Sequence, residues 1–147
     1  MSAPSFKGWQ RYGDAKVLST IKRAPFSRAI STQGGSSVHH IAFATNDIFD
    51  TMAKLRRNGA QFVPISANYY EDLRARFDLP ADDVARMRDF HILFERTATG
   101  EYLHAYSESF ADRFFFEIVQ RVGYRGYGAA NAPVRLAAQA RLSTGMP

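Results

Sequence analysis

The stretch Phe114–Arg121, FFFEIVQR, decides the fold of this chain. It is rich in aromatic and β-branched residues, which favour a β-strand. Side chains alternate between the two faces of a strand, so Glu117 shares a face with Phe115 and Val119. An ionised carboxylate among apolar side chains is costly unless it pairs with a cation or binds a metal. Glu117 is therefore half of a structural ion pair or part of a functional site, and its residue type favours neither.

The composition of the chain fits one packed domain. It has 147 residues, of which 46% are hydrophobic and 14% aromatic, which is enough for a core. It has no cysteine, which excludes disulfides, thiolate nucleophiles and cysteine-based metal sites. No apolar run reaches the roughly 20 residues of a membrane helix, and the N-terminus has no signal-peptide core. We therefore expect a cytoplasmic protein with no membrane partner.

The net charge of +5 is carried by residues 1–34, because the basic and acidic side chains after Gly34 balance. A basic segment can contact nucleic acid. No helix-turn-helix pattern or aromatic RNA-binding motif accompanies this one, so we predict no nucleic-acid partner. The flexible stretch Gln33–Ser37 separates a poorly patterned basic arm, residues 1–34, from a single folded module, residues 35–147.

The hydrophobic pattern after Gly34 predicts strands and helices in an α+β arrangement. The order is strand, helix, strand, helical insert, three strands and a last helix. Strands are expected over Val38–Thr45, Gln61–Ile65, His91–Arg96, Glu101–Ser107 and Phe114–Arg121. Helices are expected from a cap at Thr45 or Asn46 to Asn58–Gly59, over Tyr69–Phe77, from Pro80 to Arg88, and from a cap at Asn131 to Leu142.

Histidines offer partners for Glu117. The chain has four of them, and two histidines with one carboxylate form the ligand set of many non-haem Fe(II) sites. His39 and His40 should point to opposite faces of one strand, so at most one of them joins Glu117. A lone histidine on a strand is more often a hydrogen-bonded core residue than a ligand, and spacing alone leaves both roles open. No nucleotide-binding glycine loop and no GxSxG elbow is present.

Four segments resemble those of the 4-hydroxyphenylpyruvate dioxygenase family, in the family's order and spacing. They are Val38–Phe43 (VHHIAF), Asn68–Leu73 (NYYEDL), Phe115–Arg121 (FFEIVQR) and the glycine-rich Gly126–Asn131. The resemblance implies a vicinal-oxygen-chelate fold, a βαβββ module with a helical insert and a C-terminal helix. It also implies that His40 and Glu117, on the first and last strands, bind a divalent metal. Fe(II) is the expected ion, with Mn(II), Mg(II) or Co(II) as alternatives.

The strand Glu101–Ser107 departs from this pattern. The dioxygenases carry a glutamine near the substrate where this chain has His104, and a phenylalanine where it has Tyr106. Together with Asn131–Gln139, this stretch more closely resembles the dioxygenase-like C-terminal domain of bacterial 3-dehydroshikimate dehydratase fusion proteins. We take His104 and Tyr106 as candidate catalytic residues, with His104 completing the ligand set or binding the substrate. In the dioxygenases the third ligand belongs to a preceding module, which residues 1–33 do not resemble.

Three interpretations follow, and they leave open whether the chain is an enzyme. The first is Fe(II)-dependent oxidation of a 2-oxo acid or a shikimate-type compound, with a homodimer or a partner module completing the metal site. The second is a non-catalytic or regulatory metal-binding domain of a 3-dehydroshikimate dehydratase fusion. The third is a truncated product without a completed site.

Overall fold

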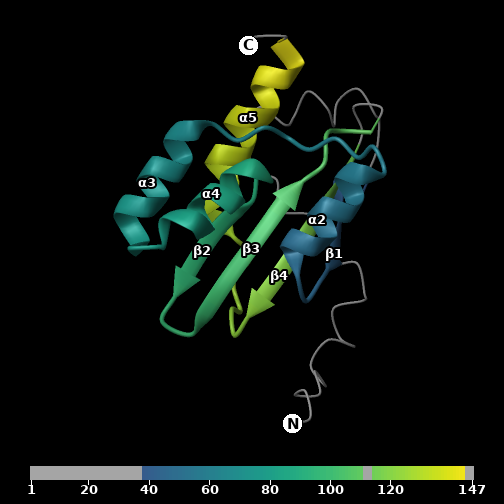
Figure 1. Cartoon of the computed structure of the whole chain (residues 1–147). Helices are drawn as coiled ribbons and strands as arrows, with labels where there is room; N and C mark the ends of the chain where they lie inside the picture. The colour runs from purple at the N-terminus through teal and green to yellow at the C-terminus, as the bar shows by residue number, and fades with distance from the viewer. Residues whose placement is uncertain (1–37, 111–113, 145–147) are drawn as a thin grey trace.

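A computed structural model describes residues 38–110 and 114–144 of the chain. The predicted arm, residues 1–34, and its boundary with the module lie outside the described residues. The described strands form one mixed sheet in the order β1-β4-β3-β2 (Figure 1). Strand β1 runs parallel to β4, whereas β4 and β3, and β3 and β2, are antiparallel. The strands are β1 His40–Ala44, β2 Leu93–Thr97, β3 Gly100–Tyr106 and β4 Phe115–Val122.

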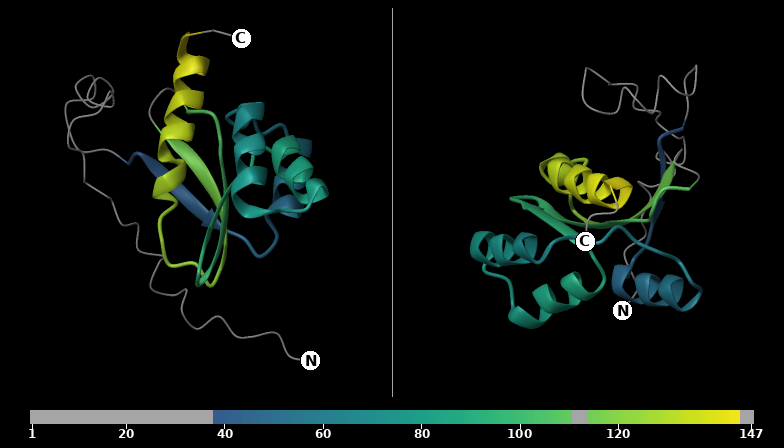
Figure 2. Two further views of the ribbon diagram at one scale, coloured as in Figure 1. Left: turned by 90° about the vertical axis from the view of Figure 1, so that its left-hand side faces the viewer. Right: turned by 90° about the horizontal axis from the view of Figure 1, so that it is seen from above.

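Helices cover both faces of this sheet. Figure 2 shows α2, α3 and α4 on one side and α5 on the other. The helices are α2 Ile48–Arg57, α3 Ala67–Phe77, α4 Ala81–Asp89 and α5 Ala132–Thr144, with a short 3-10 helix, η2, at Ala129–Asn131 before α5. Their positions confirm the predicted helix after the first strand, the helical insert and the last helix. No helix among the described residues is long and apolar enough to cross a membrane.

The first helix shows how the sequence sets an element's ends. Asp47 is the N-cap of α2, and its carboxylate accepts a hydrogen bond from the Asp50 N–H at 3.0 Å. The predicted cap at Thr45 or Asn46 is therefore wrong. The Thr45 hydroxyl bonds instead to the Thr51 hydroxyl at 2.7 Å. Gly59, with φ +86°, follows the helix in the left-handed conformation that glycine accepts without strain.

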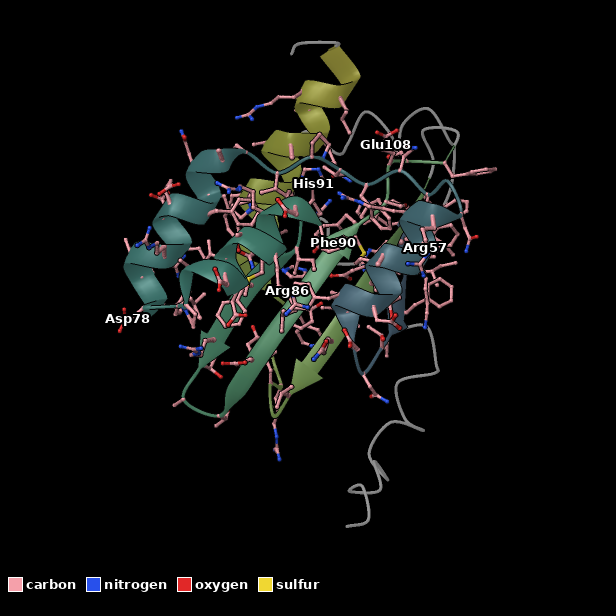
Figure 3. The ribbon with its side chains drawn as sticks, in the orientation of Figure 1. Arg57, Asp78, Arg86, Phe90, His91 and Glu108 are labelled. Atoms are coloured by element: carbon pink, nitrogen blue, oxygen red, sulfur yellow. The ribbon has the colours of Figure 1, made fainter. Side chains whose placement is uncertain are left out.

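Two predicted strands differ from the structure. Gln61–Ile65 forms only a single bridge, between Phe62 and Ser107, and the Val63 N–H donates to the Tyr106 carbonyl at 2.8 Å. Pro64 has no N–H to extend this pairing, and Ser66 is already the N-cap of α3. Strand β2 begins at Leu93 rather than at His91, because His91 follows α4 in a left-handed turn with φ +56° (Figure 3).

The main core lies between the sheet and helices α2–α4. Its fully buried side chains include Ile48 and Met52 of α2, Leu73 of α3 and Ala105 of β3. Strand β1 contrasts with this core, because all five of its residues are exposed. It is also an edge strand of the described sheet. One side of the sheet is thus well covered, whereas β1 stays open.

Candidate metal centre

One face of the sheet collects the chemically active side chains. The strand register places Glu117 beside Tyr106 of β3 and beside Ala42 of β1. Because side chains alternate along each strand, His40 and His104 fall on the same face as Glu117. We call this the site face. Strand alternation predicted which residues of β4 lie on the site face. The strand register shows that β1 and β3 flank β4 and add their own residues to that face.

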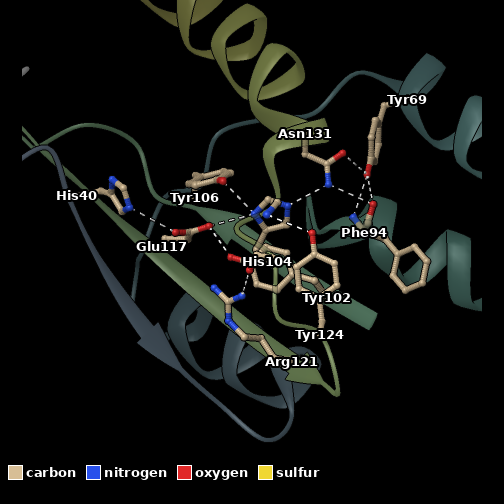
Figure 4. Close-up of polar contacts among 12 residues, drawn as sticks. His40, Tyr69, Phe94, Tyr102, His104, Tyr106, Glu117, Arg121, Tyr124 and Asn131 are labelled. Atoms are coloured by element: carbon tan, nitrogen blue, oxygen red, sulfur yellow. Dashed lines mark hydrogen bonds and ion pairs between the residues drawn. The ribbon is translucent and has the colours of Figure 1, made fainter. Parts of the chain in front are cut away.

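The structure brings the two predicted metal ligands together on the site face. His40 Nε2 lies 3.6 Å from Glu117 Oε2 (Figure 4). The His40 side chain is 35% exposed and that of Glu117 only 9%. The pair therefore lies where a buried carboxylate meets the open edge at β1.

Hydrogen bonds to Oε1, the carboxylate oxygen that faces away from His40, hold Glu117 in place. The Tyr102 hydroxyl donates to Oε1 at 2.9 Å, and His104 Nδ1 lies 3.0 Å from the same atom. Burial alone would raise the pKa of Glu117, but the hydrogen bonds that its carboxylate accepts, that from His104 first, outweigh burial and lower the pKa overall. Glu117 is therefore an ionised carboxylate whose Oε1 is fixed and whose Oε2 faces His40.

His104 is fully buried, and protein atoms contact both of its ring nitrogens. Nδ1 lies against Glu117 Oε1 and, at 2.9 Å, against the Tyr106 hydroxyl, while Nε2 lies 3.1 Å from Asn131 Nδ2. Burial lowers the pKa of His104, which favours the neutral ring. Burial, followed by the charge of Glu117, raises the pKa of Tyr106, so that hydroxyl keeps its proton. His104 thus contacts the back of Glu117 rather than His40.

His39 does not lie where strand alternation placed it. Its Nδ1 is 3.2 Å from His40 Nδ1, and its ring packs edge-on against Phe115 at 5.0 Å. The reason is that β1 begins only at His40, so alternation does not apply to His39. Burial, followed by the charges of Arg135 and His40, lowers the pKa of His39 to about 4. A neutral His39 can therefore exchange a hydrogen bond with the second nitrogen of His40.

Arg135 of α5 places a cation beside the ligand pair, which the sequence did not predict. Its guanidinium lies 5.4 Å from the Tyr106 ring and 5.3 Å from the Phe115 ring, and it donates to Gln139 Oε1 at 2.7 Å. His40 stacks on the same Phe115 ring at 5.3 Å. Arg135 and His40 therefore share one aromatic neighbour.

The ligand pair fits a metal ion but is not a full set. Two atoms bound to one ion at about 2.1 Å each are at most about 4.2 Å apart, and His40 Nε2 and Glu117 Oε2 are 3.6 Å apart. An imidazole nitrogen and a carboxylate oxygen suit Fe(II) and related divalent ions. In the part of the chain that the structure describes, no group of three or more His, Cys, Asp or Glu side chains could hold a metal. At this place the described residues therefore offer a divalent ion at most two ligands, His40 and Glu117.

Sequence reasoning missed two polar residues of this region. Asn131 was expected to cap the last helix, but its buried amide bonds to His104, to the Phe94 carbonyl and to the Tyr69 hydroxyl. For Tyr69, the sequence pattern indicates only a place in the helix that became α3. Both lie in segments that carried the family resemblance, which was the one signal that could have pointed to them.

Comparisons with known proteins support the family resemblance that the sequence motifs predicted. No protein-family model matches the chain. A 3-dehydroshikimate dehydratase of Pseudomonas putida is 45% identical over 130 residues, which are 87% of this chain and 20% of the relative. A 4-hydroxyphenylpyruvate dioxygenase of Caenorhabditis briggsae is 38% identical over 104 residues, 67% of this chain and 26% of the relative. The chain thus spans about a fifth to a quarter of the length of these relatives.

Solved structures of dioxygenase-type proteins also match the fold of this chain. A xylose isomerase-like TIM barrel/4-hydroxyphenylpyruvate dioxygenase fusion protein matches with a TM-score of 0.70 and 44% identity, over 81% of this chain and 20% of the other. A mutant 4-hydroxymandelate synthase from Streptomyces coelicolor matches with a TM-score of 0.73 and 27% identity, over 83% and 35%. The predicted resemblance and the α+β vicinal-oxygen-chelate fold are confirmed.

Proposed function

We propose that this chain, which resembles the C-terminal module of 4-hydroxyphenylpyruvate dioxygenase-like proteins, is a metal-dependent module whose ligands are His40 and Glu117. The observation that carries the proposal is the 3.6 Å separation of His40 Nε2 and Glu117 Oε2 on the site face. Glu117 is ionised although it is almost fully buried, and an ionised group in such a place needs a partner. Fe(II) is the ion we expect, since relatives of this chain are named dioxygenases.

The proposed reaction is the oxidation of a 2-oxo acid or a related shikimate-type carboxylate. When bound, Fe(II) supplies redox and Lewis-acid chemistry. The residues of this chain supply orientation. Glu117 and His40 hold the ion, Phe115 and Tyr106 form an aromatic wall, and the Arg135 guanidinium over both rings attracts an anionic substrate.

The missing part of the site is proposed to come from another module. Two ligands leave a divalent ion incompletely held. The longer relatives contain other segments, and one of the matching solved structures is a fusion of a TIM barrel with the dioxygenase. Strand β1, which carries His40, is exposed along its whole length and lies at the sheet edge. A second copy of the chain or a partner module could therefore approach His40 from this side.

Metal content and oxygen uptake test the proposal. We expect the purified chain to bind Fe(II) or Co(II), and the His40→Ala and Glu117→Ala variants each to lose most of that metal. His91→Ala is the matched control, because His91 lies outside the site and contacts the Ile65 N–H. O₂ uptake should follow addition of 4-hydroxyphenylpyruvate or 3-dehydroshikimate to the metal-loaded protein. Unchanged metal content in both ligand variants would show that the assignment is wrong.

A non-catalytic metal-binding domain is the second candidate. It is favoured by the two-ligand set of the described residues and by His104, whose ring nitrogens contact Glu117 and Asn131. Metal bound at His40 and Glu117 without O₂ uptake, in the presence of either substrate, would identify this function.

A further inference from the structure

We propose that Tyr69, Asn131 and His104 form a buried relay that fixes the His104 proton on Nδ1 and holds Glu117 Oε1. Glu117 then offers a metal only its Oε2 atom. The first part of this proposal, the position of the His104 proton, concerns the chain alone. The second part, the effect on metal binding by Glu117, rests on the proposed function. His104 is in this view a positioning residue that acts through Glu117, rather than a third ligand.

The relay begins at a backbone group of β2. The Phe94 N–H donates to the Tyr69 hydroxyl at 2.8 Å. The Asn131 side-chain nitrogen lies 3.1 Å from the Phe94 carbonyl, and its oxygen lies 3.2 Å from the Tyr69 hydroxyl. The opposite orientation of this amide would bring its oxygen against the Phe94 carbonyl, and two acceptors would then face each other. The surroundings therefore fix Nδ2 of Asn131 as a donor.

The donor at Asn131 decides where the His104 proton lies. Asn131 Nδ2 is 3.1 Å from His104 Nε2, so Nε2 must accept and carries no proton. With Nε2 unprotonated, the proton of the ring is on Nδ1, which lies 3.0 Å from Glu117 Oε1. Glu117, as a carboxylate, can only accept, so the other end of the relay requires the same tautomer. The Tyr106 hydroxyl, 2.9 Å from Nδ1, shares that proton as a second acceptor.

Packing prevents the ring from leaving this position. His104 has no exposed surface and stacks on Tyr102 at 4.4 Å. Tyr102 itself donates to Glu117 Oε1 at 2.9 Å. A Cβ atom at Gly128 would lie 2.6 Å from Tyr102 Cε1 and 3.1 Å from His104 Cε1, so the glycine backbone presses directly on both rings. The segment before α5 thus holds both donors of Glu117 in place (Figure 4).

The consequence is a carboxylate with two unequal oxygens. Oε1 is occupied by the Tyr102 hydroxyl and by His104 Nδ1–H, whereas Oε2 faces His40 Nε2 at 3.6 Å. Hydrogen-bond partners behind a metal ligand usually change metal affinity by about 10- to 100-fold. We expect the relay to contribute in this range, although none of its members touches the metal.

Nitrogen-15 NMR of the imidazoles in the metal-free full-length chain tests the first part. We expect His104 to show a protonated Nδ1 and an unprotonated Nε2. The Asn131→Asp variant replaces the donor with an acceptor, and it should move the proton to Nε2 or protonate both nitrogens. Asn46→Asp, the same change at an exposed position before α2, is the matched control and should leave the His104 signals unchanged.

Titration with Co(II), followed by its visible absorption, tests the second part. Asn131→Asp and His104→Leu should each weaken Co(II) binding by about 10- to 100-fold. His104→Gln should recover most of this loss, because its amide can still donate to Glu117. Thermal unfolding shows whether each variant folds. If a variant fails to fold, the NMR spectrum of the wild-type chain still identifies the His104 tautomer.

The outcomes separate the two proposals. A protonated Nε2 in the wild-type chain would overturn the relay, whatever the metal result. Co(II) affinity that is unchanged in a folded Asn131→Asp variant would overturn the second part, the effect of the relay on metal binding. Failure of the wild-type chain to bind Co(II), with the His104 tautomer as expected, would count against the proposed metal function and leave the relay intact.

Discussion

At the scale of single residues, His91 links a hydrogen bond to a pH dependence. The Ile65 N–H donates to His91 Nδ1 at 3.3 Å, which requires that nitrogen to be unprotonated. Burial, followed by the charge of Arg56, lowers the pKa of His91 below its ordinary value of 6.5. The folded chain thus binds this proton less readily than the unfolded chain, so the free energy of unfolding should fall as the pH drops below 6.5.

Urea unfolding at a series of pH values measures this effect. His91→Asn removes the titrating group and keeps a residue that tolerates the left-handed φ of +56°. The difference in unfolding free energy between wild type and His91→Asn should be constant above pH 6.5 and should shift against the wild type below it. A difference that does not change with pH would contradict the prediction.

The candidate site shows how far single residues can be predicted. The cost of a carboxylate in an apolar strand marked Glu117, and the resemblance paired it with His40. Its hydrogen-bond partners could not be predicted, because they depend on how β3, η2 and α3 pack against one another. Asn131 is the clearest case, since its position suggested a helix cap and only tertiary contacts reveal its bond to His104.

At the scale of elements, alanine substitution should destabilise the protein far more at Gly100 than at Gly59. A Cβ atom at Gly100, where β3 begins, would clash with backbone atoms of Val122 and Gly123. At Gly59, after α2, a Cβ atom would meet nothing within 4 Å, although φ is +86°. Gly100→Ala should therefore lower the free energy of unfolding by about 2 kcal/mol or more, because the strand ends must move apart. Gly59→Ala should cost only about 1 kcal/mol of left-handed strain.

Chemical denaturation of both variants compares these costs directly. Gly59→Asn serves as a further control, because asparagine tolerates the left-handed conformation and should cost less than alanine. Equal destabilisation by the two alanine variants would mean that the contact at Gly100 is not tight.

The elements also show why some strands were predicted and others were not. Residue patterns identified β1, β3 and β4 to within a few residues. Gln61–Ile65 has the apolar composition of a strand. A strand also needs a neighbouring strand paired with it along its length, and here the pairing is limited to one bridge, between Phe62 and Ser107. Pairing of that kind is a tertiary property, so composition alone overestimated it.

At the scale of the whole molecule, the open edge at β1 predicts that metal binding and association are linked. All residues of β1 are exposed, and Phe43 and Ile41 expose 53% and 42% of their surface. An exposed edge strand with apolar side chains favours pairing with another chain. If a second copy supplies the missing ligand, a metal shared between chains must stabilise the dimer, because it binds the dimer more tightly than the monomer.

Sedimentation velocity with and without Co(II) tests this link. We expect Co(II) to raise the dimer fraction, and the apparent Co(II) affinity to rise with protein concentration. Phe43→Lys should weaken both effects without touching His40 or Glu117, because Phe43 points to the opposite face of β1. Val122→Lys is the matched control, since Val122 is 55% exposed at the end of β4, beyond Val119, the last residue of β4 that pairs with β1. Tight Co(II) binding by a chain that stays monomeric at every concentration would mean that the remaining ligands do not come from a second copy.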